Sequence, residues 1–382
     1  MKSTLCKTLG IEVPIFAFSH CRDVVAEVTK AGGMGVLGVA YKTAEQLDVE
    51  LRWIDERVGG KPYGVDVLLP SRYEKLGERR VTADDLPAEQ VSFMRRVLDE
   101  AGIPRLPQSE GPAMVQDFLD RINMTREQTE ALLEVALRHP IKAVVSALGT
   151  PPKETVERLH GLGITVGALA GKTEHALRHK EAGIDFVVAQ GMEAGGHTGK
   201  VTSMILWPQL IDAVAPLPVL AAGGIGRGRQ MAAALALGAE GVWCGSIWLG
   251  TRESELTPTL KRRFFAAGSE DTVQSRLRSG KPARVLRSKL SDAWERPEAP
   301  AFAPMPYQTM LMVEPHLRVE RGNDDQWQYY PVGQLVGDMR AETSCRQVVH
   351  DMMNELIEAT QRLAGMVLAD EDEIRSTQRP PR

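Results

Sequence analysis

The sequence predicts an α/β fold, a (β/α)8 TIM barrel with a helical insertion after the third strand and a C-terminal helical extension. Three observations lead to this prediction: eight short apolar runs, helix-favouring segments between most of them, and two long stretches that break the alternation. Strands buried on both faces, as in a parallel sheet, require apolar runs of this kind, and eight of them joined by helices indicate a barrel.

The eight runs are short and nearly continuous in apolar residues. They cover residues 14–18, 34–38, 63–69, 142–148, 164–170, 186–190, 218–223 and 241–245. Segments with helical spacing lie between them, such as DVVAEVTKAGG and GRQMAAALALGAE, and several end in glycine, where a helix stops. An open doubly wound sheet would show the same alternation, but no GxGxxG turn follows the first strand, which favours the barrel.

The two long stretches define the expected domain organisation. About seventy residues, roughly 70–140 and rich in charge, separate the third and fourth runs and contain two or three helical patterns. The chain also continues far beyond the eighth run and includes one long amphipathic helix before the polar tail ADEDEIRSTQRPPR, which we expect to be loosely ordered. We therefore expect a barrel over 1–250, with the insertion, and a helical extension over 251–382 that packs on the barrel.

Composition restricts the class of protein. The 382 residues are 43% hydrophobic and 25% charged, with a net charge of −4, which is typical of a soluble protein and argues against a nucleic-acid-binding surface. The four cysteines show no CxxC spacing, so no disulfide framework and no metal site is expected. Without a signal peptide or a long apolar segment, we expect a cytoplasmic protein that does not enter a membrane. The chain is compatible with a homodimer.

The seventh and eighth runs end in glycine-rich turns. In a TIM barrel the active site lies at the carboxyl ends of the strands, and the loops after strands seven and eight often bind phosphate. Gly223 and Gly224 follow the seventh run, and Gly245 and Ser246 follow the eighth. Their backbone N–H groups and the serine hydroxyl are suited to hold an anion, so we expect a phosphate site there.

The sixth run ends in Gln190 and is followed by GMEAGGHTG. The Gln190 amide can pair with a flat heterocycle, while Gly195 and Gly196 permit close approach of the backbone. His197 comes directly after them, and a neutral imidazole on the active face is suited to proton transfer near pH 7. The alternative is an ordinary exposed loop histidine. We take His197 as the candidate catalytic residue.

Three further candidates lie after other strands. Phe18 ends the first run and His20 follows it; both are placed at the substrate pocket, although a packed or solvent-facing histidine is an alternative. Asp66 lies near the end of the third run, where it could accept a hydrogen bond from a ring N–H or a ribityl hydroxyl, or simply cap a loop.

Three segments, AGGMGVLG, FVVAQGMEAGGHTG and LPVLAAGGIGRGRQMAAALALGAEGVWCGS, resemble the nitronate monooxygenase family, formerly the 2-nitropropane dioxygenases. That family also contains enoyl-acyl-carrier-protein reductases, NADH:quinone reductases and a flavoprotein that processes CoA thioesters. The resemblance implies a TIM barrel with non-covalently bound FMN. It implies that Gln190 and Gly195 contact the flavin, and that Gly224 and the segment Trp243, Cys244, Gly245, Ser246 hold its phosphate.

By the same resemblance His197 falls on the active-site histidine of the family, and Asp66 takes a place where asparagine is common. The implied reaction is the oxidation of alkyl nitronates with O2. The alternative is an NAD(P)H-dependent reduction of a quinone, enoyl or CoA-thioester substrate, since the C-terminal segment GKPARVLRSKL is most similar to the thioester-processing branch. A barrel that has lost its cofactor and serves as a binding module is a third, non-enzymatic reading.

Overall fold

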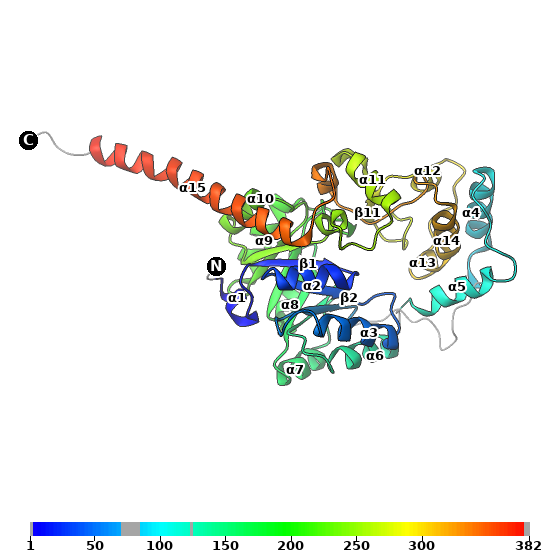
Figure 1. Ribbon diagram of the computed structural model, residues 1–382, viewed down its shortest axis with the longest axis horizontal. Coiled ribbons are helices and arrows are strands. Elements are labelled where there is room, and N and C mark those ends of the chain that lie inside the picture. Colours follow the sequence, from blue (N-terminus) through cyan, green and yellow to red (C-terminus); the bar gives the residue numbers. More distant parts are fainter. Residues whose placement is uncertain (1–2, 70–84, 123–124, 378–382) are drawn as a thin grey trace, which may run out of the picture.

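The computed structural model describes residues 3–69, 85–122 and 125–377, and its centre is a closed barrel of parallel strands (Figure 1). The strand order is β1-β2-β3-β4-β5-β6-β8-β9, and β9 closes the barrel on β1 through the pair Ala17 and Cys244. The strands are β1 (Ile15–Ser19), β2 (Met34–Gly38), β3 (Gly64–Val67), β4 (Ala143–Ser146), β5 (Thr165–Ala170), β6 (Phe186–Gln190), β8 (Val219–Ala222) and β9 (Gly241–Cys244). Each lies within one of the eight predicted runs, except that β1 extends one residue beyond its run to Ser19, so the barrel is confirmed.

Alternation along the strands sorts the apolar side chains into two cores. One set fills the barrel interior and is closed at the amino-terminal end by α1 (Thr4–Leu9); from the strands it includes Phe16, Met34, Val36, Val145, Phe186, Val188, Leu220 and Trp243. The neighbouring positions pack outward against the helices, as Ala17, Leu37, Val144, Val187 and Cys244 do. Both faces of every strand are thereby buried, which explains the continuous apolar runs.

Helices surround the barrel between the strands. They are α2 (Arg22–Lys30), α3 (Ala44–Asp55), α6 (Arg126–Ala136), α7 (Lys153–Gly161), α8 (Thr173–Glu181), α9 (Ser203–Val214) and α10 (Gly228–Ala236). Local sequence fixes where several begin. Thr43 and Gln46 form a capping box at the start of α3, and Thr125 and Gln128 form another at the start of α6.

The predicted insertion contributes α4 (Ala88–Glu100) and α5 (Gly111–Asp120), while its first part, 70–84, lies outside the described residues. Figure 1 shows α4 and α5 beside the C-terminal helices α12 (Lys289–Ala293), α13 (Tyr307–Leu311) and α14 (Val313–Gly322). A shared apolar cluster joins the two regions, with Phe93 and Leu98 from the insertion and Trp294 and Met312 from the extension.

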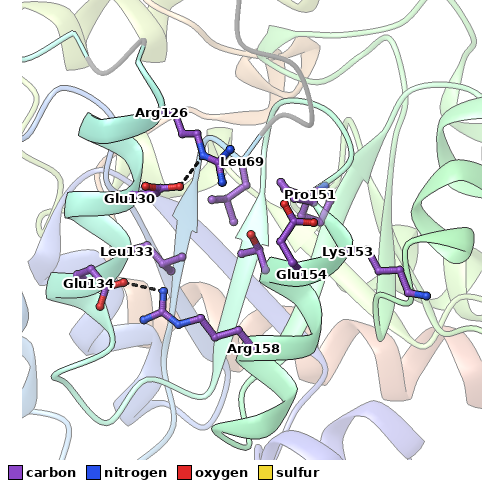
Figure 2. A pocket seen from close by; sticks show the side chains of 11 residues that line it. Leu69, Arg126, Glu130, Leu133, Glu134, Pro151, Lys153, Glu154 and Arg158 are labelled. Atoms are coloured by element: carbon purple, nitrogen blue, oxygen red, sulfur yellow. Dashed lines mark hydrogen bonds and ion pairs between the residues drawn. The ribbon is translucent and has the colours of Figure 1, made fainter.

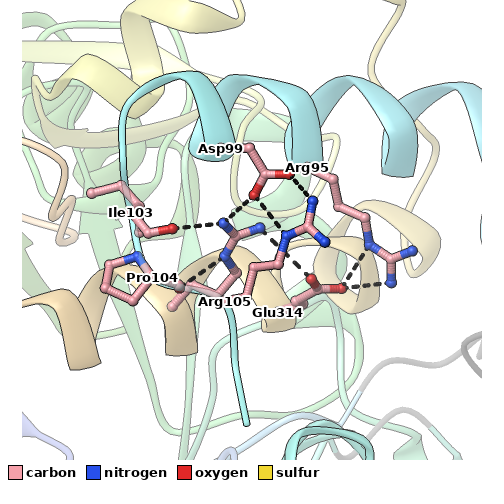
Figure 3. A network of polar contacts seen from close by, with 7 residues as sticks. Arg95, Asp99, Ile103, Pro104, Arg105 and Glu314 are labelled. Carbon is pink, nitrogen blue, oxygen red and sulfur yellow. Dashed lines mark hydrogen bonds and ion pairs between the residues drawn. The ribbon is translucent and has the colours of Figure 1, made fainter. Parts of the chain in front are cut away.

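A buried arginine completes this junction (Figure 3). Arg318 on α14 is 1% exposed and donates to Asp99 Oδ1 at 2.7 Å, to the carbonyl of Ile103 at 2.7 Å and to that of Pro104 at 3.1 Å. Asp99 also accepts from Arg105, and together the two guanidinium groups lower the pKa of Asp99 to about 2. The insertion and the extension are therefore tied by charge as well as by apolar packing.

The extension also contains strands that the sequence did not indicate. The hairpin of β10 (Thr272–Ser275) and β11 (Ala283–Leu286) pairs with the short strand β7 (Gly196–His197) in an antiparallel sheet of order β10-β11-β7. The other elements are α11 (Pro258–Ala266) and the short 3-10 helices η2 (Ser246–Gly250), η3 (Ser269–Asp271) and η4 (Gln334–Asp338). Residues from the extension thus reach the loop that holds the candidate histidine.

The last helix, α15 (Cys345–Thr377), packs against α10 and then projects past the barrel (Figure 1). The tail expected to be loosely ordered is therefore helical up to Thr377, and only 378–382 lie outside the described residues. Ala369, Glu371, Glu373 and Arg375 are good helix formers, so a polar composition did not prevent helix formation. Within the described ranges, no helix combines the length and apolarity that crossing a membrane would require.

Candidate active site

The carboxyl ends of the strands bring four of the candidate side chains to the inner face of the barrel. Phe18, Asp66, Gln190 and Trp243 alternate with residues that face the helices, so they point inward. Phe18 stacks on Trp243 with ring centroids 6.1 Å apart. Aromatic rings, a carboxyl group and an amide therefore meet at one end of the barrel, as expected for a site that binds a flat, polar ring.

His197 lies on β7, where its backbone pairs with Ala283 of the C-terminal hairpin. The hairpin also contacts both ring nitrogens. Nδ1 lies 3.2 Å from the carbonyl oxygen of Pro282, and Nε2 lies 3.2 Å from Oγ of Ser279. The orientation of the candidate catalytic ring is thus set by residues more than eighty positions further along the chain.

These contacts define the protonation state of His197. The Pro282 carbonyl can only accept, so Nδ1 carries the hydrogen and Nε2 keeps its lone pair, which accepts from Ser279. Burial lowers the pKa of His197 to about 4, and the positive charges of Arg278 and Lys281 act in the same direction, while the hydrogen bond that Nδ1 donates to Pro282 opposes them. His197 is still exposed to solvent, but its surroundings favour the neutral form of the imidazole.

Glu193 holds the loop before His197 in place. Its carboxylate accepts the backbone N–H of Ser203 at 3.0 and 3.1 Å and the Ser203 hydroxyl at 2.8 Å, which ties the loop to the first turn of α9. Gly195 lies against the backbone of the extension, because a Cβ there would stand 2.8 Å from the nitrogen of Gly333. Gly196 has φ +77°, a left-handed conformation that favours glycine.

At the predicted phosphate site the two glycines have left-handed backbone conformations, and the extension adds one contact. Gly223 and Gly224 have φ of +110° and +71°, and within the described ranges their N–H groups have no hydrogen-bond acceptor. Opposite them, Ser246 Oγ accepts the N–H of Gly333 at 2.8 Å, so the extension contributes to this region too.

Two nearby groups are not available for an anion. The amino terminus of α10 is already capped by Glu355 of α15, which accepts the Gly228 N–H at 2.8 Å. Cys244 points toward the helices and is 2% exposed, and burial raises the pKa of its thiol to about 12. Only the backbone of Cys244 therefore faces the site.

Asp66 is a buried carboxyl group with one oxygen that is not hydrogen-bonded within the described residues. It is 4% exposed, and within the described residues its Oδ2 atom has no hydrogen-bond partner. Burial without a counter-charge raises the pKa of Asp66 well above its usual range, which favours the neutral acid, a form that can both donate and accept. A buried orphan of this kind at the end of a barrel strand fits a ligand with a polar ring edge.

His20 lies near the same end of the barrel and is held in place. Its Nδ1 lies 2.9 Å from the carbonyl oxygen of Gly38, and burial lowers its pKa to about 4. Its ring makes edge contacts with Phe18 and with Tyr41, at 5.2 and 6.5 Å between centroids. Arg278, in the hairpin that carries Ser279, donates to the Tyr41 hydroxyl at 3.3 Å.

Sequence reasoning missed Ser279, Arg278 and Tyr41. The first two belong to the turn of a hairpin whose pairing with β7 spans more than eighty residues, so no local pattern connects them to His197. Tyr41 follows β2 directly, and its position after a barrel strand could have identified it. It has φ +67°, an uncommon conformation for a non-glycine residue.

One cavity and a cluster of three possible metal ligands contain none of the candidate site residues. The cavity, of about 530 Å³, lies between α6 and α7. Figure 2 shows its lining side chains, among which Arg126 pairs with Glu130 and Arg158 with Glu134, both at 2.6 Å. None of the candidate residues lines it. Elsewhere Cys21, Asp23 and Glu255 lie close enough to hold a metal ion, but burial raises the pKa of the Cys21 thiol to about 11, which disfavours the thiolate that a metal needs.

Comparison with known proteins gives a consistent match. A family model described as nitronate monooxygenase matches residues 2–355. A protein of Mycobacterium tuberculosis named monooxygenase Rv1533 is 46% identical and covers 96% of this chain and 100% of its own. A nitronate monooxygenase by name from Staphylococcus haemolyticus is 29% identical, over 95% and 98% of the two chains. Among solved structures, a nitroalkane oxidase from Streptomyces ansochromogenes has a TM-score of 0.75 at 28% identity, covering 94% of this chain and all of its own.

Proposed function

The chain belongs to the nitronate monooxygenase family and is an oxidoreductase of that type, and we propose that it binds FMN and oxidises alkyl nitronates with O2. Two nitronates and one O2 would give two carbonyl compounds and two nitrite ions. The observation that carries this proposal is the placement of neutral His197 at the end of a barrel that offers flavin-binding groups, with an Nε2 lone pair that accepts from the Ser279 hydroxyl and could take a proton in its place.

Three features support FMN as the cofactor. The orphaned acid of Asp66 and the inward amide of Gln190 can pair with the polar edge of the flavin ring. The unpaired N–H groups of Gly223 and Gly224, opposite Gly245 and Ser246, can hold its phosphate. When bound, FMN would accept electrons from the substrate and deliver them to O2.

The protein itself would position the substrate and move a proton. With a neutral nitroalkane, Nε2 of His197 takes the proton on the carbon next to the nitro group, and the electron pair of the broken C–H bond moves onto the nitro oxygens. This produces the nitronate in place. With a preformed nitronate no proton has to be removed, and His197 serves only to position the anion.

The test is an anaerobic mixing experiment with the FMN-loaded protein. Ethyl nitronate should bleach the flavin absorbance, and NADH or NADPH should leave it oxidised. Bleaching by a nicotinamide with no response to nitronate would instead support the alternative reductase acting on a quinone, enoyl or thioester substrate. Protein that stays colourless when FMN is added would favour the cofactor-free binding module.

A further inference from the structure

Arg278 stands out among the charged groups near the site because the fold holds it firmly in place. It lies in the turn between β10 and β11, where Leu277 is fully buried and its carbonyl accepts from Gln308 Nε2 at 3.0 Å. On its other side, Ser279 is 3% exposed and contacts His197. Gly280 follows with φ +76° and lies tightly against the carbonyl of Ala303. A rigid turn therefore carries the guanidinium.

The guanidinium has no acidic partner. Within the described ranges no carboxylate forms an ion pair with the partly buried Arg278, whereas the fully buried Arg318 has Asp99. The contacts recorded for Arg278 are with Tyr41, whose hydroxyl lies at 3.3 Å and whose ring centre lies 5.7 Å from Cζ. An enclosed arginine usually pairs with an acid, so one that faces only aromatic groups has donors left over for an anion.

The surroundings place this charge at the candidate active site. The charge of Arg278 adds to burial in lowering the pKa of both His20 and His197. Burial raises the pKa of the Tyr329 phenol to about 12, while Arg278 opposes that rise. The contacts place it there as well. Arg278 donates to Tyr41, whose ring centroid lies 6.5 Å from that of His20. The adjacent Ser279 contacts Nε2 of His197.

We propose that Arg278 is the anion-binding residue of the site, and that its guanidinium holds the two oxygens of a planar anion beside Nε2 of His197. Nitronates and carboxylates share this planar pair of oxygens, which matches the fork of N–H donors on arginine. The inference rests on the proposed function and adds to it the recognition of the substrate by charge. Arg278 would also stabilise the negative charge that appears on the nitro oxygens as His197 removes the proton.

A binding experiment tests this independently of turnover. Butyrate and its neutral analogue butyramide are titrated into the FMN-loaded protein by calorimetry. Arg278→Gln should weaken butyrate binding about tenfold or more, as expected for the loss of a charge-assisted contact, and should leave butyramide unaffected. Arg278→Lys keeps the charge without the fork and should fall between. Arg276→Gln, exposed on the same turn, is the matched control and should bind butyrate like the wild type.

Kinetics distinguish the two sources of the anion. If Arg278 holds the nitronate oxygens, Arg278→Gln raises KM for ethyl nitronate; if it holds a carboxylate elsewhere on the substrate, KM rises only for a nitronate that also carries a carboxylate. Either result supports the proposal. Equal butyrate affinity in the wild type and both Arg278 variants, with flavin content and melting temperature unchanged, would overturn it. Failure of the wild-type protein to oxidise any nitronate, with Arg278-dependent butyrate binding intact, would instead reject the proposed function.

Discussion

Nε2 of His197 accepts a hydrogen bond from Oγ of Ser279, 82 positions later in the chain, at 3.2 Å. The bond joins the loop after β6 to the turn between β10 and β11. It also marks the nitrogen that is available as a base, because Nδ1 is engaged with the carbonyl of Pro282.

Ser279→Ala should slow the deprotonation of a neutral nitroalkane by up to about tenfold, the effect of one lost hydrogen bond that orients the ring. Oxidation of preformed ethyl nitronate is the internal control and should change little, since no proton is removed there. Steady-state rates with nitroethane and with its nitronate give the comparison. An equal loss with both substrates would show that Ser279 supports the fold of the turn and not the base.

The pH dependence of nitroalkane oxidation should reflect the lowered pKa of His197. Burial and the charge of Arg278 disfavour the imidazolium, so the base stays neutral, and therefore active, as pH falls from 7 to 5, and it is lost only near pH 4. The acidic limb of kcat/KM for nitroethane measures this. Arg278→Gln removes one of the charges and should move the limb to higher pH. A wild-type limb near pH 6.5, the ordinary value for histidine, would contradict the account.

Asp66→Asn should stabilise the FMN-free protein at neutral pH. The raised pKa of Asp66 means that the folded state holds its proton more tightly than the unfolded state does. The free energy of unfolding of the wild type therefore falls as pH rises above about 4, the ordinary pKa of an aspartate. The variant has no carboxyl group at this position and does not share this fall. Urea unfolding of both proteins at pH 5 and pH 8 should show a larger advantage for the variant at pH 8.

The amide of Asp66→Asn can still pair with a polar ring edge, so FMN affinity should stay within a few-fold of the wild type. Asp66→Leu offers no such partner and should weaken FMN binding by the equivalent of about 1–3 kcal/mol, the cost of an unpaired polar group at a buried contact. Fluorescence titration with FMN compares the three proteins. Equal affinity in all three would place Asp66 outside the cofactor site.

The barrel could be predicted from the sequence because its signal is local. Each strand is buried on both faces, as in FVVAQ, and each run records that burial directly. The candidate residues at the strand ends followed from the same alternation, since Asp66 and Gln190 occupy inward positions at the end of their runs.

The contribution of the C-terminal extension could not be predicted in this way. The contact of Gly333 with Ser246 and that of Ser279 with His197 join segments more than eighty residues apart, and no periodicity encodes them. The hairpin strands are short, and β10 includes polar residues such as Gln274, so they gave no apolar run. Arg278 was overlooked for the same reason.

Arg318→Met should destabilise the junction between the insertion and the extension by about 3 kcal/mol. The change strands the buried carbonyl of Ile103 and the partly buried carbonyl of Pro104 and removes one partner of Asp99, and breaking a buried ion pair costs about 3–5 kcal/mol, here reduced because Asp99 stays partly exposed and keeps Arg105. Arg105→Met is the matched control, since this exposed side chain shares Asp99 and its loss should change stability far less. Denaturant unfolding measures both, and equal values would show that the buried guanidinium adds nothing.

The central claim is that neutral His197 removes the proton from a nitroalkane beside bound FMN. The most direct measurement compares His197→Ala with the wild type on nitroethane and on preformed ethyl nitronate, with flavin content determined in both proteins. We predict that FMN stays bound, that oxidation of nitroethane falls about 10²-fold or more, as is typical for the loss of a general base, and that oxidation of ethyl nitronate changes far less. Unchanged oxidation of nitroethane by His197→Ala would contradict the account.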